Sequence, residues 1–152
     1  MKISIIAVGK CGQSPEGDLI KRYTDRIPWN ITIKEIEERR PIKGDERKKS
    51  ESAMLIAALP KNPFIIVLDE RGRAFNSPDF ASKLTFATEN GFDNICFIIG
   101  GADGLSSYIL EKAHLKISFG NMVWPHMMVR VMLSEQIYRA WAIINRHPYH
   151  KE

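Results

Sequence analysis

The sequence predicts one α/β domain, residues 1–152, whose mainly parallel sheet carries helices on both faces. Three observations lead to this fold class. Short β-branched segments alternate with segments of helical periodicity, which is the order of parallel α/β folds. Two apolar runs, residues 64–68 and 94–99, show no regular alternation with polar residues, as expected of strands covered on both faces. A chain of 152 residues also has the length of a domain with a substantial core.

The elements of the first half follow from apolar spacing and from the residues that break it. Residues 3–8 are mostly apolar and β-branched, and Gly9 and Gly12 follow them. The expected elements are a strand over residues 3–8, a helix over 15–27, a strand that ends near 37, a charged loop and helix start over 38–49, a helix that stops before Pro60, and a strand over 64–68.

Turn and cap residues divide the second half in the same way. Ser77 before Pro78 is typical of an N-cap with proline at the first helical position. The expected elements are a polar loop over residues 69–74, a helix over 77–89, a strand over 94–99, a short helix over 106–113, a short strand over 115–118, a loop over 119–125, a long helix over 126–145 and a tail over 146–152.

The long helix, residues 126–145, is apolar around most of its circumference, whereas a surface helix shows a single apolar face. We therefore expect it to bury two faces, one against its own sheet and one against a second subunit. The alternative is a helix enclosed wholly within one domain. Glu135 and Arg139 stand four positions apart on this helix, which is the spacing of a surface ion pair.

The composition is that of a globular protein, with 26% charged residues and a net charge of +4. The positive balance favours an anionic partner such as RNA. Cys11 and Cys96 are far apart and lack metal-ligand spacing, so no metal site is expected, and unpaired thiols suit a reducing compartment. The first apolar run is too short for a signal peptide and no run is long enough to cross a bilayer. We therefore expect a cytoplasmic protein without a membrane partner.

Three loops follow strands at the edge where open α/β sheets bind their ligands. They cover residues 68–72, 100–104 and 119–125, and three glycines in the second loop permit a close approach of the backbone to a ligand. Ordinary tight turns are the alternative explanation. The Gly-x-Gly-x-x-Gly, P-loop and Gly-x-Ser-x-Gly motifs are absent, which disfavours classical dehydrogenases, kinases and α/β-hydrolases.

Basic residues gather in two stretches. The first, within residues 39–49, is a candidate for phosphate contact, but Asp45 and Glu46 dilute it, so a solvated face is favoured. The second, residues 146–151, mixes basic side chains with the ring of Tyr149, a combination typical of segments that grip an unstacked base. A frayed terminus is the alternative for this tail.

Taken together, several segments resemble one known family. They are residues 1–10, Leu68-Asp69 with Gly72, residues 97–105, Trp124-Pro125-His126, residues 129–131 and 135–140, and His147-Pro148-Tyr149-His150. In this order, and over nearly the whole chain, they are similar to the bacterial large-subunit ribosomal RNA methyltransferases within the SPOUT (α/β-knot) family.

The resemblance implies an α/β fold with a C-terminal trefoil knot, a feature that patterning alone would disfavour. It also implies a homodimer that binds S-adenosyl-L-methionine in the knot. By motif, the cofactor-binding residues are Leu68, Gly100, Phe119, Gly120, Asn121, Met122, Val123 and Trp124, which belong to the three loops selected by the strand ends. The implied substrate is a pseudouridine of 23S ribosomal RNA, methylated at N3 on the assembled 70S ribosome, with no role for DNA.

Methyl transfer from a sulfonium requires an aligned, electron-rich nitrogen, and N3 must lose its proton. The expected catalytic residues are His150, Tyr149 and Arg139, the last of which would stabilise charge or hold phosphate. Second choices are His126 and Arg130, and Glu135 is a weaker candidate for a base. Because the tail follows the knot, one subunit could offer its tail to the cofactor of the other.

Three alternatives stay open at this point. The first is a SPOUT methyltransferase with another RNA target, which the lack of an added RNA-binding domain disfavours. The second is a non-catalytic ribosome-binding protein of the same fold, which the glycines at 100, 101 and 104 and the complete tail disfavour. The third is a small-molecule hydrolase, which the missing nucleophile motif disfavours.

Overall fold

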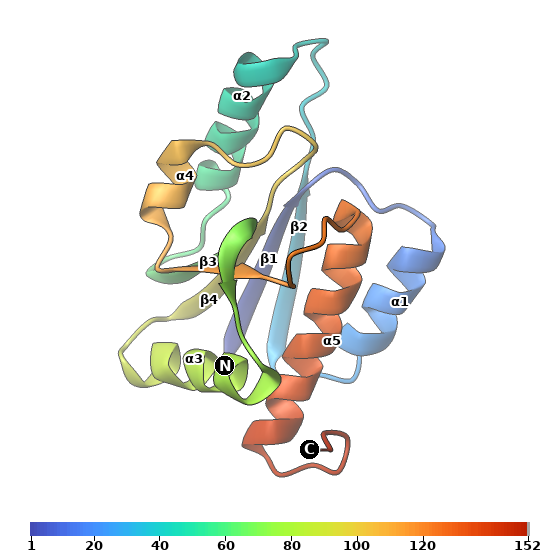
Figure 1. Cartoon of the computed structure of the whole chain (residues 1–152), viewed down its shortest axis with the longest axis vertical. Helices are drawn as coiled ribbons and strands as arrows, with labels where there is room; N and C mark the ends of the chain where they lie inside the picture. Colours follow the sequence, from blue (N-terminus) through green and yellow to red (C-terminus); the bar gives the residue numbers. More distant parts are fainter. Residues whose placement is uncertain (152) are drawn as a thin grey trace.

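The five strands form one parallel sheet in the order β2-β1-β4-β3-β5 (Figure 1). The computed structural model describes residues 1–151; Glu152, which ends the predicted tail and domain, lies outside the described residues. The strands are β1 (Lys2–Val8), β2 (Asn30–Ile36), β3 (Pro63–Ala74), β4 (Asn94–Ile99) and β5 (Leu115–Ser118). The helices are α1 (Pro15–Thr24), α2 (Gly44–Ala57), α3 (Ser77–Glu89), α4 (Ser107–Lys112) and α5 (His126–Ile144).

Two apolar cores lie on opposite faces of the sheet, because successive side chains of a strand point to opposite sides. On one face Ile5 and Phe97 belong to the core completed by α3 and α5. On the other face Ile6 and Ile98 belong to the core completed by α2 and α4. Cys96 lies in this second core, where burial raises the pKa of its thiol to about 12 and keeps it protonated. The predicted class, a parallel sheet with helices on both faces, is confirmed, and the trefoil crossing stays a prediction.

β3 is longer than the sequence indicates, because residues 69–74 continue the strand where a polar loop was expected. The strand pairs with β4 as far as Leu68. It pairs with β5 over residues 66–68 and, after a register shift, again at Arg73 and Ala74. Gly72 permits the close passage of the two strands, since a Cβ there would lie only 2.7 Å from the carbonyl carbon of Ile117. Such pairing depends on residues that are distant in sequence, so local polarity misled the prediction.

Helix starts also differ in detail from expectation. The N-cap of α3 is Asn76, not Ser77: its side-chain oxygen accepts a hydrogen bond from the Asp79 N–H at 2.8 Å. α2 begins at Gly44, so the basic residues 47–49 lie on its first turns. This placement brings part of the basic stretch close to the carboxyl ends of the strands.

α5 packs against α1 and α3 and buries Leu133, Ile137 and Ala140. Met128 and Met132 on the same helix are only half-buried by the described residues. As expected, one apolar face of α5 is therefore covered by other parts of the same chain. The second subunit expected against the other face stays a prediction.

The tail turns back at the end of α5 (Figure 1). Arg146 has a φ of +54°, and the N–H of His147 donates to the Ala142 carbonyl at 2.8 Å. The Arg146 N–H donates to the Ile143 carbonyl at 3.3 Å. These two bonds form a Schellman motif in which arginine occupies the position that glycine usually takes. The reversal brings the tail back alongside α5.

Candidate active site

A cavity of about 730 Å³ opens at the carboxyl ends of β4 and β5 and beside the register shift within β3, and we call it the strand-end cavity. Its volume is in the range of pockets that hold cofactors and other small ligands. All three loops selected from the sequence contribute to it. Of the predicted cofactor residues, its lining includes Leu68, Gly100, Phe119, Gly120, Met122, Val123 and Trp124. Asn121 is exposed and does not line this cavity.

The turn at residues 100–104 forms one wall of the strand-end cavity. A Cβ on Gly101 would lie 2.9 Å from a side-chain carbon of Val8, so this position has no room for a side chain. Gly104 has a φ of +77°, which favours glycine, and its N–H donates to the Gly101 carbonyl at 3.0 Å. The turn therefore presents backbone groups to the cavity.

The loop at residues 119–125 forms another part of the wall. The Trp124 indole N–H donates to the Phe119 carbonyl at 3.2 Å, which ties the two ends of the loop together. Met122 and Val123 are 74% and 79% exposed at the rim of the cavity. Neighbouring exposed apolar side chains of this kind indicate a surface that a ligand or a partner covers.

Charges of both signs line the strand-end cavity. Burial raises the pKa of Asp69, but hydrogen bonds from the backbone and guanidinium of Arg71, at 2.8 and 3.3 Å, outweigh it and lower that pKa overall. Asp69 is therefore an anion at neutral pH. Lys48 reaches the cavity from α2, and Asp103 reaches it from the turn. A cavity with separated positive and negative groups suits a zwitterionic ligand.

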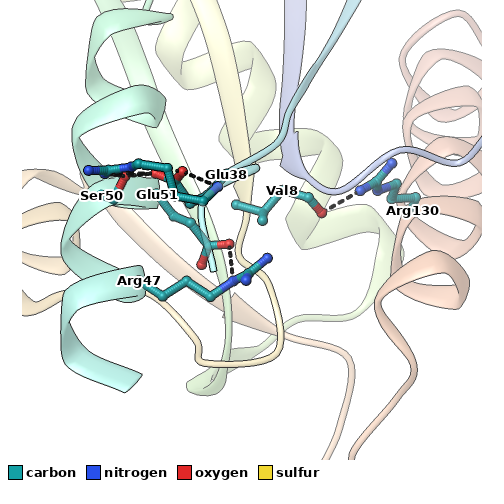
Figure 2. A network of polar contacts seen from close by, with 7 residues as sticks. Val8, Glu38, Arg47, Ser50, Glu51 and Arg130 are labelled. Carbon is teal, nitrogen blue, oxygen red and sulfur yellow. Dashed lines mark hydrogen bonds and ion pairs between the residues drawn. The ribbon is translucent and has the colours of Figure 1, made fainter. Parts of the chain in front are cut away.

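Arg130, a second choice for catalysis, is buried and bonded to the ends of two strands (Figure 2). Its side chain is 3% exposed and donates from Nη2 to the carbonyls of Val8 and Gly9, at 2.7 and 2.8 Å. Nη1 pairs with Glu35 at 2.8 Å. Arg130 therefore fastens α5 to the ends of β1 and β2. His126, the other second choice, is exposed and lines the strand-end cavity.

Four side chains gather beside α5, and we call them the tail cluster: Glu135, Arg139, Tyr149 and His150. Arg139 donates to Glu135 Oε1 from Nε at 3.0 Å and from Nη2 at 2.5 Å. The Tyr149 hydroxyl donates to the same oxygen at 2.8 Å. The Arg139 guanidinium also lies over the Tyr149 ring, 4.9 Å from its centroid. The expected surface ion pair is thus part of a half-buried network.

Hydrogen-bond geometry indicates which groups of the tail cluster donate and which accept. Arginine has only donors, so His150 Nδ1, 3.3 Å from Arg139 Nη1, acts as the acceptor and the proton of the neutral ring lies on Nε2. Burial and the hydrogen bond to Glu135 raise the pKa of Tyr149 to about 12. Gln136 donates to the other oxygen of Glu135 at 2.8 Å. The cluster therefore offers hydrogen-bond donors and the positive charge of Arg139. The Glu135 carboxylate already accepts hydrogen bonds from its neighbours.

The structure brings the predicted catalytic residues together, but not beside the predicted cofactor residues. Among the described residues that line the strand-end cavity, Arg139, Tyr149 and His150 do not occur. Glu135 lines a second cavity, also about 730 Å³, which shares Phe119 with the first. Within one chain, Glu135 is the member of the cluster that approaches the 119–125 loop.

Comparison with known proteins identifies the family. The family model described as "Predicted SPOUT methyltransferase" matches residues 1–150. The chain belongs to the SPOUT methyltransferase family. The resemblance noted from the motifs is thereby confirmed, and the chain is an enzyme that moves a methyl group. Family membership also implies a cofactor that donates the methyl group.

Relatives of this SPOUT methyltransferase carry a common name. A protein of Paramagnetospirillum magneticum is 44% identical over 151 residues, and one of Rhodospirillum centenum is 43% identical, each match covering 99% of both chains. A protein of Paracoccus denitrificans is 43% identical over 161 residues, covering 100% of both chains. All three are named ribosomal RNA large subunit methyltransferase H.

A solved structure supports the same SPOUT fold. The structure of a probable methylase family protein from Haemophilus influenzae Rd KW20 matches with a TM-score of 0.56 and 11% identity. The match covers 99% of this chain and 70% of the other. At that identity, the similarity supports the fold alone.

Some residues of the site were not found from the sequence. Lys48 was assigned to a solvated face, yet it lines the strand-end cavity, and Glu51, three positions later on α2, is buried behind the turn. Their i, i+3 spacing on a helix was the available signal. In the described part of the chain, no helix is long and apolar enough to span a membrane, and no group of three potential metal ligands occurs.

Proposed function

We propose that this SPOUT methyltransferase transfers a methyl group from S-adenosyl-L-methionine to N3 of a pseudouridine in 23S ribosomal RNA. We propose further that it acts on the assembled 70S ribosome as a cytoplasmic homodimer with one domain per chain. The observation that carries the proposal is the strand-end cavity, built from the motif-bearing loops, in a chain 44% identical to a protein named for large-subunit ribosomal RNA methylation.

The strand-end cavity has the chemistry that S-adenosyl-L-methionine requires. This cofactor carries a sulfonium, an amino acid group of both charges, and an adenosine. Backbone groups of the 100–104 turn suit the adenosine, and Lys48 suits the cofactor carboxylate. Asp69 and Asp103 provide anions for its positive groups. When bound, the cofactor supplies the electrophilic methyl group; the residues of the chain orient it and exclude water.

The tail cluster supplies what the target base requires. N3 of a pseudouridine reacts as an anion: its proton passes to solvent water, and the electron pair of the broken N–H bond then receives the methyl group. The Arg139 cation and the Nε2–H of His150 are donors for the oxygens of that anion. We therefore assign His150, Tyr149 and Arg139 to binding and stabilising the anionic base. Glu135 accepts from Arg139 and Tyr149, so its role is to hold both donors in place.

A site shared between two subunits accounts for the separation of cavity and tail cluster. His126 lines the cavity at the start of α5, and Arg139 follows it by 13 positions. At 1.5 Å per residue, this distance is about 20 Å along the helix. In a twofold dimer, the tail cluster of one subunit would lie over the cavity of the other. The half-buried Met128 and Met132 on α5 would contribute to the contact.

The test is methyl transfer from radiolabelled S-adenosyl-L-methionine to ribosomes from cells that lack their own enzyme of this type. Whole 70S ribosomes, separated subunits and transfer RNA are compared, with His150→Ala as the variant. We expect label in a pseudouridine of the large-subunit RNA of 70S ribosomes, lost in the variant. Label in transfer RNA would instead support a SPOUT enzyme with another RNA target. Absence of label from every RNA, with a folded protein, would support a non-catalytic ribosome-binding protein.

A further inference from the structure

A buried carboxylate, which Figure 2 shows beside Arg47, lies against Gly101 of the 100–104 turn. Glu51 lies on α2, and its side chain is 4% exposed. Oε2 lies 3.5 Å from Nε of Arg47, whereas buried Oε1 has no hydrogen-bond partner among the described residues. A Cβ on Gly101 would lie 3.3 and 3.5 Å from the two oxygens. Glu51 thus touches the turn from behind, opposite the strand-end cavity.

Folding alone does not account for this carboxylate. A buried charge is costly unless hydrogen bonds satisfy it, and an apolar side chain of similar size is often as stable or more so. Glu51 has one incomplete ion pair, and the partner Arg47 is 37% exposed, so solvent screens its positive charge. Asp103, on the cavity side of the turn, adds a second negative charge nearby. The carboxylates of Glu51 and Asp103 therefore both lie near Gly101, and Arg47 is the cation paired with Glu51.

A negative charge behind the turn changes the affinity of a ligand in the cavity according to the charge of that ligand. In a medium of low polarity, a buried anion strengthens the binding of a cation several ångströms away and leaves a neutral group nearly unaffected. S-adenosyl-L-methionine carries a positive sulfonium, and its product S-adenosylhomocysteine carries a neutral thioether in the same place. The two ligands otherwise carry the same charged groups, so the charge on the sulfur is the difference to which the Glu51 carboxylate would respond.

We propose that Glu51 is a specificity-determining residue, whose buried carboxylate behind Gly101 favours the sulfonium cofactor over the neutral thioether product. This inference rests on the proposed function, because it takes S-adenosyl-L-methionine as the ligand of the strand-end cavity. The consequence is functional: once the methyl group has left, the attraction is lost and the product dissociates more readily.

The test is isothermal titration calorimetry of the dimer at pH 8 with each ligand in turn. Glu51→Gln keeps the shape and removes the charge, and Glu51→Met serves if the glutamine variant does not fold. We expect the affinity for S-adenosyl-L-methionine to fall about tenfold, equivalent to about 1.4 kcal/mol, while that for S-adenosylhomocysteine changes by less than about twofold. The matched control is Glu38→Gln, because Glu38 is a satisfied carboxylate of the same region, bonded to Arg40 and Ser50.

The possible results separate the two proposals. Equal loss of affinity for both ligands would mean that Glu51 only supports the fold of the turn, and unchanged affinity for both would mean that its charge is not sensed. Either result overturns the inference. A wild-type protein that binds neither ligand would instead overturn the proposed function. An equal change of the affinity ratio in Glu38→Gln would show that removing any negative charge from this region has the same effect, and would also overturn the inference.

Discussion

Replacing Arg130 with methionine is expected to destabilise the protein strongly, because this arginine fastens α5 to the sheet. The change removes two hydrogen bonds, to the carbonyls of Val8 and Gly9 at 2.7 and 2.8 Å, and the ion pair with Glu35. Methionine fills most of the vacated volume, so the cost comes from the polar groups left behind. Removing one member of a buried network of this kind costs about 3–5 kcal/mol.

The assay is unfolding in urea, followed by circular dichroism, together with a thermal scan. For a chain of this size, 3–5 kcal/mol corresponds to a fall in Tm of about 6–20 °C. Arg139→Met is the matched control, since Arg139 is 25% exposed and its ion pair contributes about 1 kcal/mol or less. We expect the control to keep its stability and to lose methyl transfer.

The opposite pattern would refute this assignment of roles. If Arg130→Met unfolds at the same urea concentration as the wild type and loses methyl transfer, then Arg130 acts in catalysis and not in the fold. If Arg139→Met is the variant that unfolds early, then the tail cluster is structural, and His150 and Tyr149 lose their main support as catalytic residues.

Three further predictions concern other parts of the molecule. Burial raises the pKa of Glu51 above 4.5. The stability of the wild type relative to Glu51→Gln should therefore be highest below pH 4.5 and should be lost as the pH rises through the pKa of Glu51 in the folded protein. Urea midpoints of both proteins from pH 4 to 8 measure this difference. Gly72→Ala should lower the free energy of unfolding by about 1–3 kcal/mol, because the new Cβ would lie 2.7 Å from the Ile117 backbone; an unchanged urea midpoint would contradict this. Tyr149→Phe removes the hydrogen bond to Glu135 and should lower the free energy of unfolding by about 1 kcal/mol or less. The methyl-transfer rate should fall at least about tenfold, and an unchanged rate would exclude a role of Tyr149 in positioning.

Local sequence patterns were enough to predict the layers of the fold. The unbroken apolar runs that became β3 and β4 required cover on both faces, and the cores on the two sides of the sheet provide it. The rule that ligands bind at the carboxyl ends of parallel strands selected the loops of the strand-end cavity. These features depend on residues that are close in the sequence and on a general rule for parallel sheets, so a single sequence is enough to predict them.

Features that depend on distant pairing were missed. Residues 69–74 look like a loop, because their strand pairing with β5 joins segments more than 40 positions apart. Glu51 looks like a surface residue of a charged helix, yet the turn at 100–104 covers it. Arg146 carries no glycine signal, although it adopts the positive φ that turns the tail toward Glu135. In each case the tertiary contact overrides the local preference.

The central claim is that the strand-end cavity and the tail cluster are two halves of one methyl-transfer site, contributed by different subunits. Leu68→Arg fills the cavity, and Arg139→Met disables the tail cluster. Each variant is expected to be inactive alone. The decisive measurement is methyl transfer to 70S ribosomes by a heterodimer of the two variants, purified through two different tags. The account predicts about half of the wild-type activity, because one of the two sites regains both intact halves. An inactive heterodimer, or failure of the chains to associate, would contradict it.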